Sequence, residues 1–291
     1  TLTLGELKCA DDFWRILENQ LRKLDTDHID FYHFHGIGES ALSGPIREFR
    51  LFEQAAKARD RGLIRHLSFS FHDRPAAMKT LIDTGEFSSV LFQYNLLDVA
   101  NAEMIAYAAG KGLGTVAMGP VGGGRLAFAG GVFEDALGGK FTTPELALRF
   151  VLANPAVSCA LSGMGSAAMV DANTRVASDA DPLTEPELAA LVRVREQCGE
   201  LRNLYCTGCN YCGPSCPEHV RIPAVLEALI YDRVYGFREH ARSSYARIGS
   251  APDKEERNAS ACVGCGLCES KCPQKLPIRK HLAEARALFE G

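Results

Sequence analysis

Two short runs of cysteine near the C-terminus constrain this chain more than any other feature. Each run has the spacing C-x2-C-x2-C-x3-C and is followed directly by proline, at 206–217 and again at 262–273. Thiolate is a soft ligand, and this spacing is typical of loops that hold iron–sulfur clusters. The duplicated run therefore predicts two [4Fe–4S] clusters and, with them, electron transfer.

The ligands of each cluster are expected to come from both runs. In two-cluster ferredoxins the fourth cysteine of a run binds the other cluster. The predicted ligands of the first cluster are Cys206, Cys209, Cys212 and Cys272. Those of the second cluster are Cys262, Cys265, Cys268 and Cys216.

Two other uses of these eight cysteines remain open, namely zinc sites and disulfides. Neither of them requires two copies of the same spacing, each closed by proline. The three cysteines outside the runs, Cys9, Cys159 and Cys198, are interpreted as ordinary small side chains. Because clusters persist in reducing compartments, a cytoplasmic location is predicted.

Composition limits the partners. The chain has 291 residues and a net charge of −4, which gives no indication of a nucleic-acid or anionic-membrane partner. No apolar run reaches the roughly 18 residues needed to span a bilayer. The length predicts about two domains. We place them at 1–180 and 181–291.

Before residue 178 the sequence alternates between apolar strand-like segments and helical patterns. Five strands are predicted, at 29–34, 63–69, 90–94, 115–118 and 157–161, and each precedes a helical pattern. This alternation is typical of a parallel sheet in a βα-barrel or a doubly wound fold. The glycine-rich stretch 119–139 is predicted to be a loop. Since a closed barrel of this kind needs eight strands, we expect a C-terminal portion of a longer protein.

The C-terminal part is predicted to be mainly helical. Thr184 and Glu187 have capping-box spacing and start a predicted helix that runs to about Cys198. Residues 222–235 have a helical apolar pattern with proline in the first turn. Together with the cysteine runs, these helices indicate a ferredoxin-like domain that carries a helical insertion.

His35 is the leading candidate for a catalytic side chain. It lies at the C-terminal end of the first predicted strand, and that rim carries the active site in βα-barrels. A histidine there can donate a hydrogen bond to a substrate carbonyl or transfer a proton. The alternative is a structural histidine that bonds to a neighbouring backbone group.

Several segments together resemble the aldo/keto reductase family. The matching segments are 12–35, 64–73, 93–95, 116–126 and 162–164, with Asn173. The resemblance covers about residues 10–178 and implies a partial TIM-type (β/α)8 barrel of five βα units, strands 4–8. A cluster-bearing branch of the family would account for the remainder.

By this resemblance, His35 is the active-site histidine that bonds the substrate carbonyl, while Ser70 and Gln93 hold the nicotinamide carboxamide. Met118 occupies the position where many members stack an aromatic ring on the nicotinamide. The remaining nucleotide-binding residues are implied to be Gly119, Val121 and Gly123 at the pyrophosphate, and Gly163, Met164, Ser166 and Asn173 at the adenosine end. Without the resemblance, the glycines can equally be simple turns and Met118 ordinary core.

The sequence departs from the family pattern in two ways. NADP-preferring members commonly place basic side chains at two positions that here hold Gly163 and Met169, so NADH is favoured over NADPH. The family's tyrosine, lysine and aspartate come from the first three strand regions, which this chain does not contain. We therefore expect no carbonyl reduction by this chain alone.

The combined prediction is an oxidoreductase of the aldo/keto reductase type. It would couple nicotinamide-dependent chemistry on a small carbonyl or alcohol to electron transfer through two [4Fe–4S] clusters, with a one-electron redox protein as partner. The alternative is a non-catalytic electron carrier or redox sensor that uses the barrel as a scaffold. In a third interpretation the clusters are purely structural.

Overall fold

The computed structural model describes residues 1–179, 182–203, 206, 210–250, 255–272 and 275–291. The chain forms two compact units, and each combines segments that are distant in sequence. The first, here called the sheet unit, comprises Thr1–Gly122 and Ala147–Pro182. The second, the helical unit, comprises Gly123–Leu146 and Leu183–Gly291.

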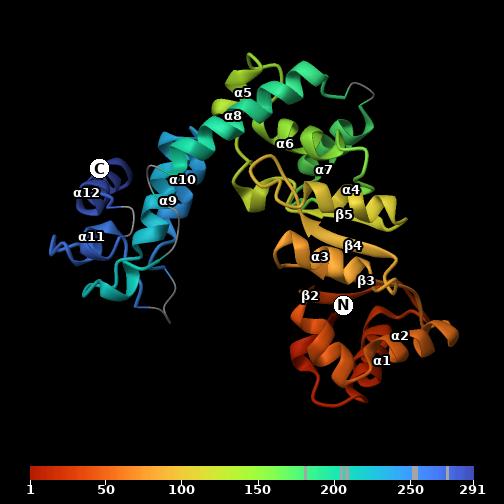
Figure 1. Ribbon diagram of the computed structural model, residues 1–291. Helices are drawn as coiled ribbons and strands as arrows, with labels where there is room; N and C mark the ends of the chain where they lie inside the picture. Colours follow the sequence, from red (N-terminus) through yellow and green to blue (C-terminus); the bar gives the residue numbers. More distant parts are fainter. Residues whose placement is uncertain (180–181, 204–205, 207–209, 251–254, 273–274) are drawn as a thin grey trace. The chain divides into compact units, whose positions relative to one another are not determined.

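The sheet unit contains a parallel sheet whose strands follow one another in chain order (Figure 1). Its strands are β1 (Leu2–Thr3), β2 (Ile29–Ile37), β3 (Ile64–Phe71), β4 (Ser89–Gln93), β5 (Gly114–Met118) and β6 (Cys159–Ala160). The five predicted strands are confirmed. β1 was not predicted, because two residues are too few to show a periodicity. Sequential parallel order is the arrangement of consecutive βα units, and among the described strands β1 and β6 form the sheet edges.

Helices follow the strands as the sequence pattern indicates. They are α1 (Asp12–Leu24), α2 (Leu51–Asp60), α3 (Pro75–Ile82), α4 (Ala102–Gly110), α6 (Thr143–Leu152) and α7 (Ala167–Ser178). In α1 the buried residues Phe13, Ile16, Leu17 and Leu21 recur at helical spacing, so one face of the helix packs inward. The helix ends at Asp25, whose φ of 52° is left-handed.

The two faces of the sheet differ in burial. On β2, Tyr32 and Phe34 are fully buried, whereas Phe31 between them is 51% exposed. The register carries this alternation across the sheet, since Tyr32 pairs with Leu67 and Phe34 with Phe69. One face is therefore packed with large apolar side chains, and the other presents Phe31 and His35.

The helical unit is built around α9 (Ile222–Arg233), which packs against α10 (Arg238–Ala246) and α12 (Ile278–Phe289). The unit also contains α5 (Val132–Ala136), α8 (Glu185–Asn203) and α11 (Leu267–Lys271). The predicted helix at 222–235 is confirmed. The predicted helix from Thr184 is longer than expected and extends to Asn203.

The expectation that 119–139 is entirely loop is wrong. Within it lie a 3-10 turn, Gly122–Gly124, and helix α5. Phe133 of α5 is fully buried and contacts the rings of Tyr235 and Phe237. At Gly131 (φ 97°) a Cβ would lie 2.7 Å from the Phe237 ring, so only glycine allows this approach. Packing against distant residues, rather than a local pattern, accounts for this helix.

No helix in the described part of the chain has both the length and the apolar character needed to cross a lipid bilayer.

Candidate functional sites

Four of the predicted site residues lie on one face of the sheet, at the carboxyl ends of β2 to β5. Phe34 pairs with Phe69, which places His35 beside Ser70. Ser70 in turn pairs with Leu91, and Gln93 pairs with Met118. Because side chains alternate between faces, His35, Ser70, Gln93 and Met118 lie on the same face of the sheet, with Gln93 two positions beyond the β4 residue that pairs with Ser70.

Hydrogen bonds between side chains and the backbone fix the ends of these strands. Ser70 is buried, and its Oγ accepts a hydrogen bond from the backbone N–H of Gly36 at 2.7 Å. The Asn101 amide donates to the backbone carbonyl of Gln93 at 3.0 Å. The Asn95 amide donates to the carbonyl of Gly119 at 3.1 Å. The rim is thus held by buried polar side chains and is not a loose set of loop ends.

The backbone at Gly119 adopts a conformation that favours glycine. Its φ is 61°, and a Cβ there would lie 2.7 Å from Nε2 of Gln93. The Gln93 amide therefore lies close to the Gly119 backbone.

His35 is exposed, and among the described residues its imidazole has no hydrogen-bond partner. The described contacts therefore do not support the alternative of a structural histidine that bonds to a neighbouring backbone group. Its neighbour on the same face, His33, is half-buried, and burial lowers the pKa of His33, with a further contribution from His35. In the described strands this face carries no tyrosine and no lysine.

The residues predicted for the nucleotide lie in loops and helix starts after the strands. Ser166 caps α7, and its Oγ accepts from the backbone N–H of Met169 at 3.3 Å. The Asn173 amide donates to Ser162 Oγ at 3.0 Å, which ties α7 to the loop after β6. Gly163 and Met164 are exposed. Val121 is half-buried in the sheet unit, whereas Gly123 (φ 66°) begins the helical unit.

A second candidate site is a cavity in the helical unit that is lined by cysteines from both runs. Its walls include Cys216, Cys262, Cys265 and Cys268, together with Arg279 and Leu282. These four cysteines are the set predicted for the second cluster. In the described part of the chain, no three Cys, His, Asp or Glu side chains converge as the ligands of one ion would. The cysteines surround the cavity instead, and four thiolate donors suit a [4Fe–4S] cluster.

The remaining predicted ligands lie in the apolar core beside α9 and α12. Cys212 and Cys272 are each 7% exposed, and Cys206 is half-buried against the same core. Cys206 also lines a neighbouring cavity with His219, Arg221 and Glu227. Cys209 lies outside the described residues.

The loop of the second run turns through two glycines with positive φ, Gly264 (74°) and Gly266 (79°). Burial raises the pKa of the Cys268 thiol, and the neighbouring Cys262 and Cys265 add to this effect. The three thiols are therefore close enough to interact electrostatically.

Arg279 is a functional candidate that sequence reasoning missed. Its backbone N–H and Nε donate to the Glu269 carboxylate at 2.9 and 3.0 Å. Hydrogen bonding to Glu269 is the main cause of its raised pKa, and the Cys268 and Cys262 thiols contribute. A fixed cation thus lies beside the cysteine cavity, where it stabilises negative charge.

Comparison with known proteins matches two regions of the chain. Residues 10–130 match the aldo/keto reductase family, and residues 205–278 match the 4Fe-4S dicluster domain. The chain carries an aldo/keto reductase domain followed by a 4Fe–4S dicluster domain. The match to the 4Fe-4S dicluster domain supports iron–sulfur clusters over the zinc and disulfide alternatives.

Two curated relatives correspond to these two parts. The uncharacterized oxidoreductase YqkF of Bacillus subtilis is 26% identical over 200 residues, which is 60% of this chain and 63% of the relative. A probable glycolate oxidase iron-sulfur subunit of the same organism is 32% identical over 100 residues, 31% of this chain and 19% of that protein. The chain therefore spans less than two thirds of the oxidoreductase that it matches.

Solved structures resemble the aldo/keto reductase part. The holo form of the aldo-keto reductase AKR11C1 from Bacillus halodurans has a TM-score of 0.55 and 26% identity, over 64% of this chain and 67% of that chain. The aldo-keto reductase Tm1743 has a TM-score of 0.52 and 24% identity, over 63% of this chain and 66% of that chain, which is a likeness of fold. The sheet with helices between its strands and the helical C-terminal region fit these two assignments.

Proposed function

We propose that this protein couples nicotinamide-dependent carbonyl or alcohol chemistry at the sheet rim to electron transfer through two [4Fe–4S] clusters. The observation that carries the proposal is the cavity in which Cys216 of the first run meets Cys262, Cys265 and Cys268 of the second. A cluster held by both runs requires the dicluster arrangement. We place the protein in the cytoplasm, where such clusters persist.

The rim supplies groups suited to a nicotinamide and a carbonyl. The exposed imidazole of His35 would donate a hydrogen bond to the substrate oxygen. Ser70 and Gln93 would orient the carboxamide of the nicotinamide, and Met118 would contact its ring. The lack of a basic residue at Gly163 and Met169 leaves a 2′-phosphate without a charged partner, which favours NADH.

The electron count of the two sites matches. A hydride is a proton with two electrons, whereas each cluster carries one electron. Oxidation of one NADH to NAD+ therefore releases two electrons, enough to reduce each of the two clusters by one electron, and its proton goes to solvent. The small-molecule substrate and the one-electron partner would exchange electrons through the two clusters.

We further propose that the 291-residue chain does not reduce carbonyls by itself. On the described strands, the face that bears His35 offers neither a tyrosine nor a lysine to supply the proton. Nucleotide binding and cluster reduction do not need those groups and would remain.

Anaerobic mixing of the cluster-loaded chain with NADH tests the proposal. We expect loss of nicotinamide absorbance and appearance of the EPR signal of reduced clusters, with two clusters reduced for each NADH oxidised. Addition of a small aldehyde should produce no further turnover. Clusters that dithionite reduces and NADH leaves oxidised would contradict the proposed coupling.

That outcome would instead support a second candidate function, a non-catalytic electron carrier or redox sensor. The lack of a tyrosine or lysine beside His35 on the described strands is the observation that favours it. Clusters that neither reagent reduces would support a purely structural role.

A further inference from the structure

The surface beside the second cluster cavity is basic, although the chain as a whole is acidic. Residues 262–282 contain four lysine or arginine residues and one carboxylate, whereas the whole chain has a net charge of −4. The cations are Lys271, Lys275, Arg279 and Lys280, and all four are exposed. Glu269, the carboxylate of this segment, is paired with Arg279, and Glu218, which also lines the cavity, is paired with Arg257. Their charges are therefore locally neutralised, and the lysines give the surface a net positive potential.

These cations border the cysteine cavity. Arg279 lines that cavity and also the adjoining depression, which contains Lys275 and Lys280. The positive charge therefore extends to the cavity that would hold the second cluster.

Exposed apolar side chains lie at the same place. Val263 is 65% exposed and Leu267 is 51% exposed, and both flank the exposed ligand Cys265. Large apolar side chains next to an exposed redox centre, with cations around them, match the centre and rim of a transient protein interface.

The cavity beside the first run has a different character. It is lined by Glu227, Glu255 and Glu256, with Arg221 as the arginine among its walls. Arg221 pairs with Glu256 at 2.9 Å. An acidic partner would therefore be repelled at this cavity and attracted at the other one.

We propose that the surface formed by Val263, Cys265, Leu267, Lys271, Lys275, Arg279 and Lys280 docks an acidic one-electron carrier protein of the flavodoxin type. This rests on the proposed electron-transfer function. In the complex one electron leaves the reduced second cluster and enters the carrier, so the cluster is oxidised by one electron and the carrier reduced by one. No covalent bond forms or breaks.

The test is stopped-flow oxidation of the dithionite-reduced, cluster-loaded full chain by oxidised flavodoxin. At low ionic strength we expect a fast second-order reaction that slows as salt is added. Lys275→Glu with Lys280→Glu should lower its rate constant at least tenfold at low salt, and the difference should shrink at high salt. No described residue forms an ion pair with Lys275 or Lys280, so the substitutions should leave folding intact.

The matched control is Arg238→Glu with Arg242→Glu on α10. Both arginines are exposed in the same unit, and the change in net charge is identical. This variant should slow the reaction clearly less than the lysine variant, because neither arginine lines the two cavities beside the second run. Equal slowing in both variants, or a rate independent of salt, would overturn the inference while leaving the cluster assignment intact. A chain without reducible clusters would overturn the inference and the proposed function together.

Discussion

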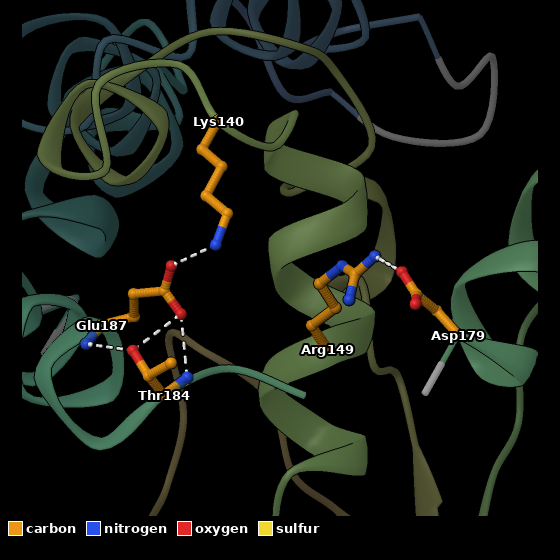
Figure 2. Close-up of polar contacts among 5 residues, drawn as sticks. All are labelled: Lys140, Arg149, Asp179, Thr184 and Glu187. Carbon is orange, nitrogen blue, oxygen red and sulfur yellow. Dashed lines mark hydrogen bonds and ion pairs between the residues drawn. The ribbon is translucent and has the colours of Figure 1, made fainter. Parts of the chain in front are cut away.

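Lys140 Nζ lies 2.7 Å from the Glu187 carboxylate, which joins the segment after β5 to the first turn of α8 (Figure 2). The same carboxylate accepts hydrogen bonds from the backbone N–H and the hydroxyl of Thr184, at 2.8 and 2.9 Å. The capping box predicted from Thr184 and Glu187 is therefore extended by a lysine that lies 47 residues away in sequence. These contacts lower the pKa of Glu187 to about 2, with the hydrogen bond from Lys140 as the largest cause.

Glu187 should make stability sensitive to acid. Because its folded-state pKa lies below the ordinary value of 4.5, the carboxylate stabilises the fold above pH 4.5, and this contribution is lost as the pH falls toward 2. We expect Glu187→Gln to flatten the decrease in unfolding free energy over this window, as measured by urea denaturation at a series of pH values. Glu185→Gln, an exposed neighbour in the same turn, should keep the slope. An unchanged slope in Glu187→Gln would refute the assignment.

Phe133 should be essential for the stability of the helical unit. It is fully buried against Tyr235 and Phe237, so Phe133→Ala should cost about 3–5 kcal/mol in unfolding free energy. The half-buried Phe128 provides the control, and Phe128→Ala should cost clearly less. Hydrogen exchange localises the effect: amides of α9 and α10 should lose protection, while those of β2 to β5 keep it. Loss confined to the sheet unit would be inconsistent with this packing.

Nucleotide preference should respond to charge at Met169. This side chain is 47% exposed, and Gly163 has open space where a Cβ would be. Met169→Arg with Gly163→Lys should strengthen NADPH binding relative to NADH by about tenfold, through charge-assisted bonds to the 2′-phosphate. Nucleotide fluorescence titration measures the ratio. Val170→Arg, one position along α7 and 43% exposed, should leave it unchanged; an equal gain in that variant would show a non-specific charge effect.

The proposed exchange of the fourth ligand between the two runs predicts which cysteine variants share a defect. Cys216→Ser should remove the same EPR signal as Cys262→Ser, although Cys216 belongs to the first run. Cys272→Ser should instead match Cys206→Ser. Each variant should retain about half of the iron, since one cluster remains. Cys9→Ser, an exposed thiol of the sheet unit, serves as the control. A defect in Cys216→Ser that matches Cys206→Ser would show that each run closes its own cluster.

Much of this architecture could be predicted because it depends on local patterns. The strand positions follow from apolar segments, and a register of parallel strands then places His35, Ser70, Gln93 and Met118 on one face. The cysteine spacing likewise predicted which four cysteines, Cys216, Cys262, Cys265 and Cys268, belong together, and these four line one cavity.

Other features depend on contacts between residues distant in sequence. Helix α5 forms where Phe133 meets Tyr235 and Phe237, about 100 residues later, and its glycine-rich surroundings indicated only a loop. Arg279 was missed because its place beside Cys268 follows from its pairing with Glu269 and the packing of α12. A lone arginine in a helix carries no sequence signal of such a role.

Metal analysis of anaerobically purified protein tests the central claim most directly. Two [4Fe–4S] clusters require about eight irons and about eight acid-labile sulfides per chain, with a one-electron EPR signal on reduction. A colourless protein that contained zinc, and neither iron nor sulfide, would contradict the account.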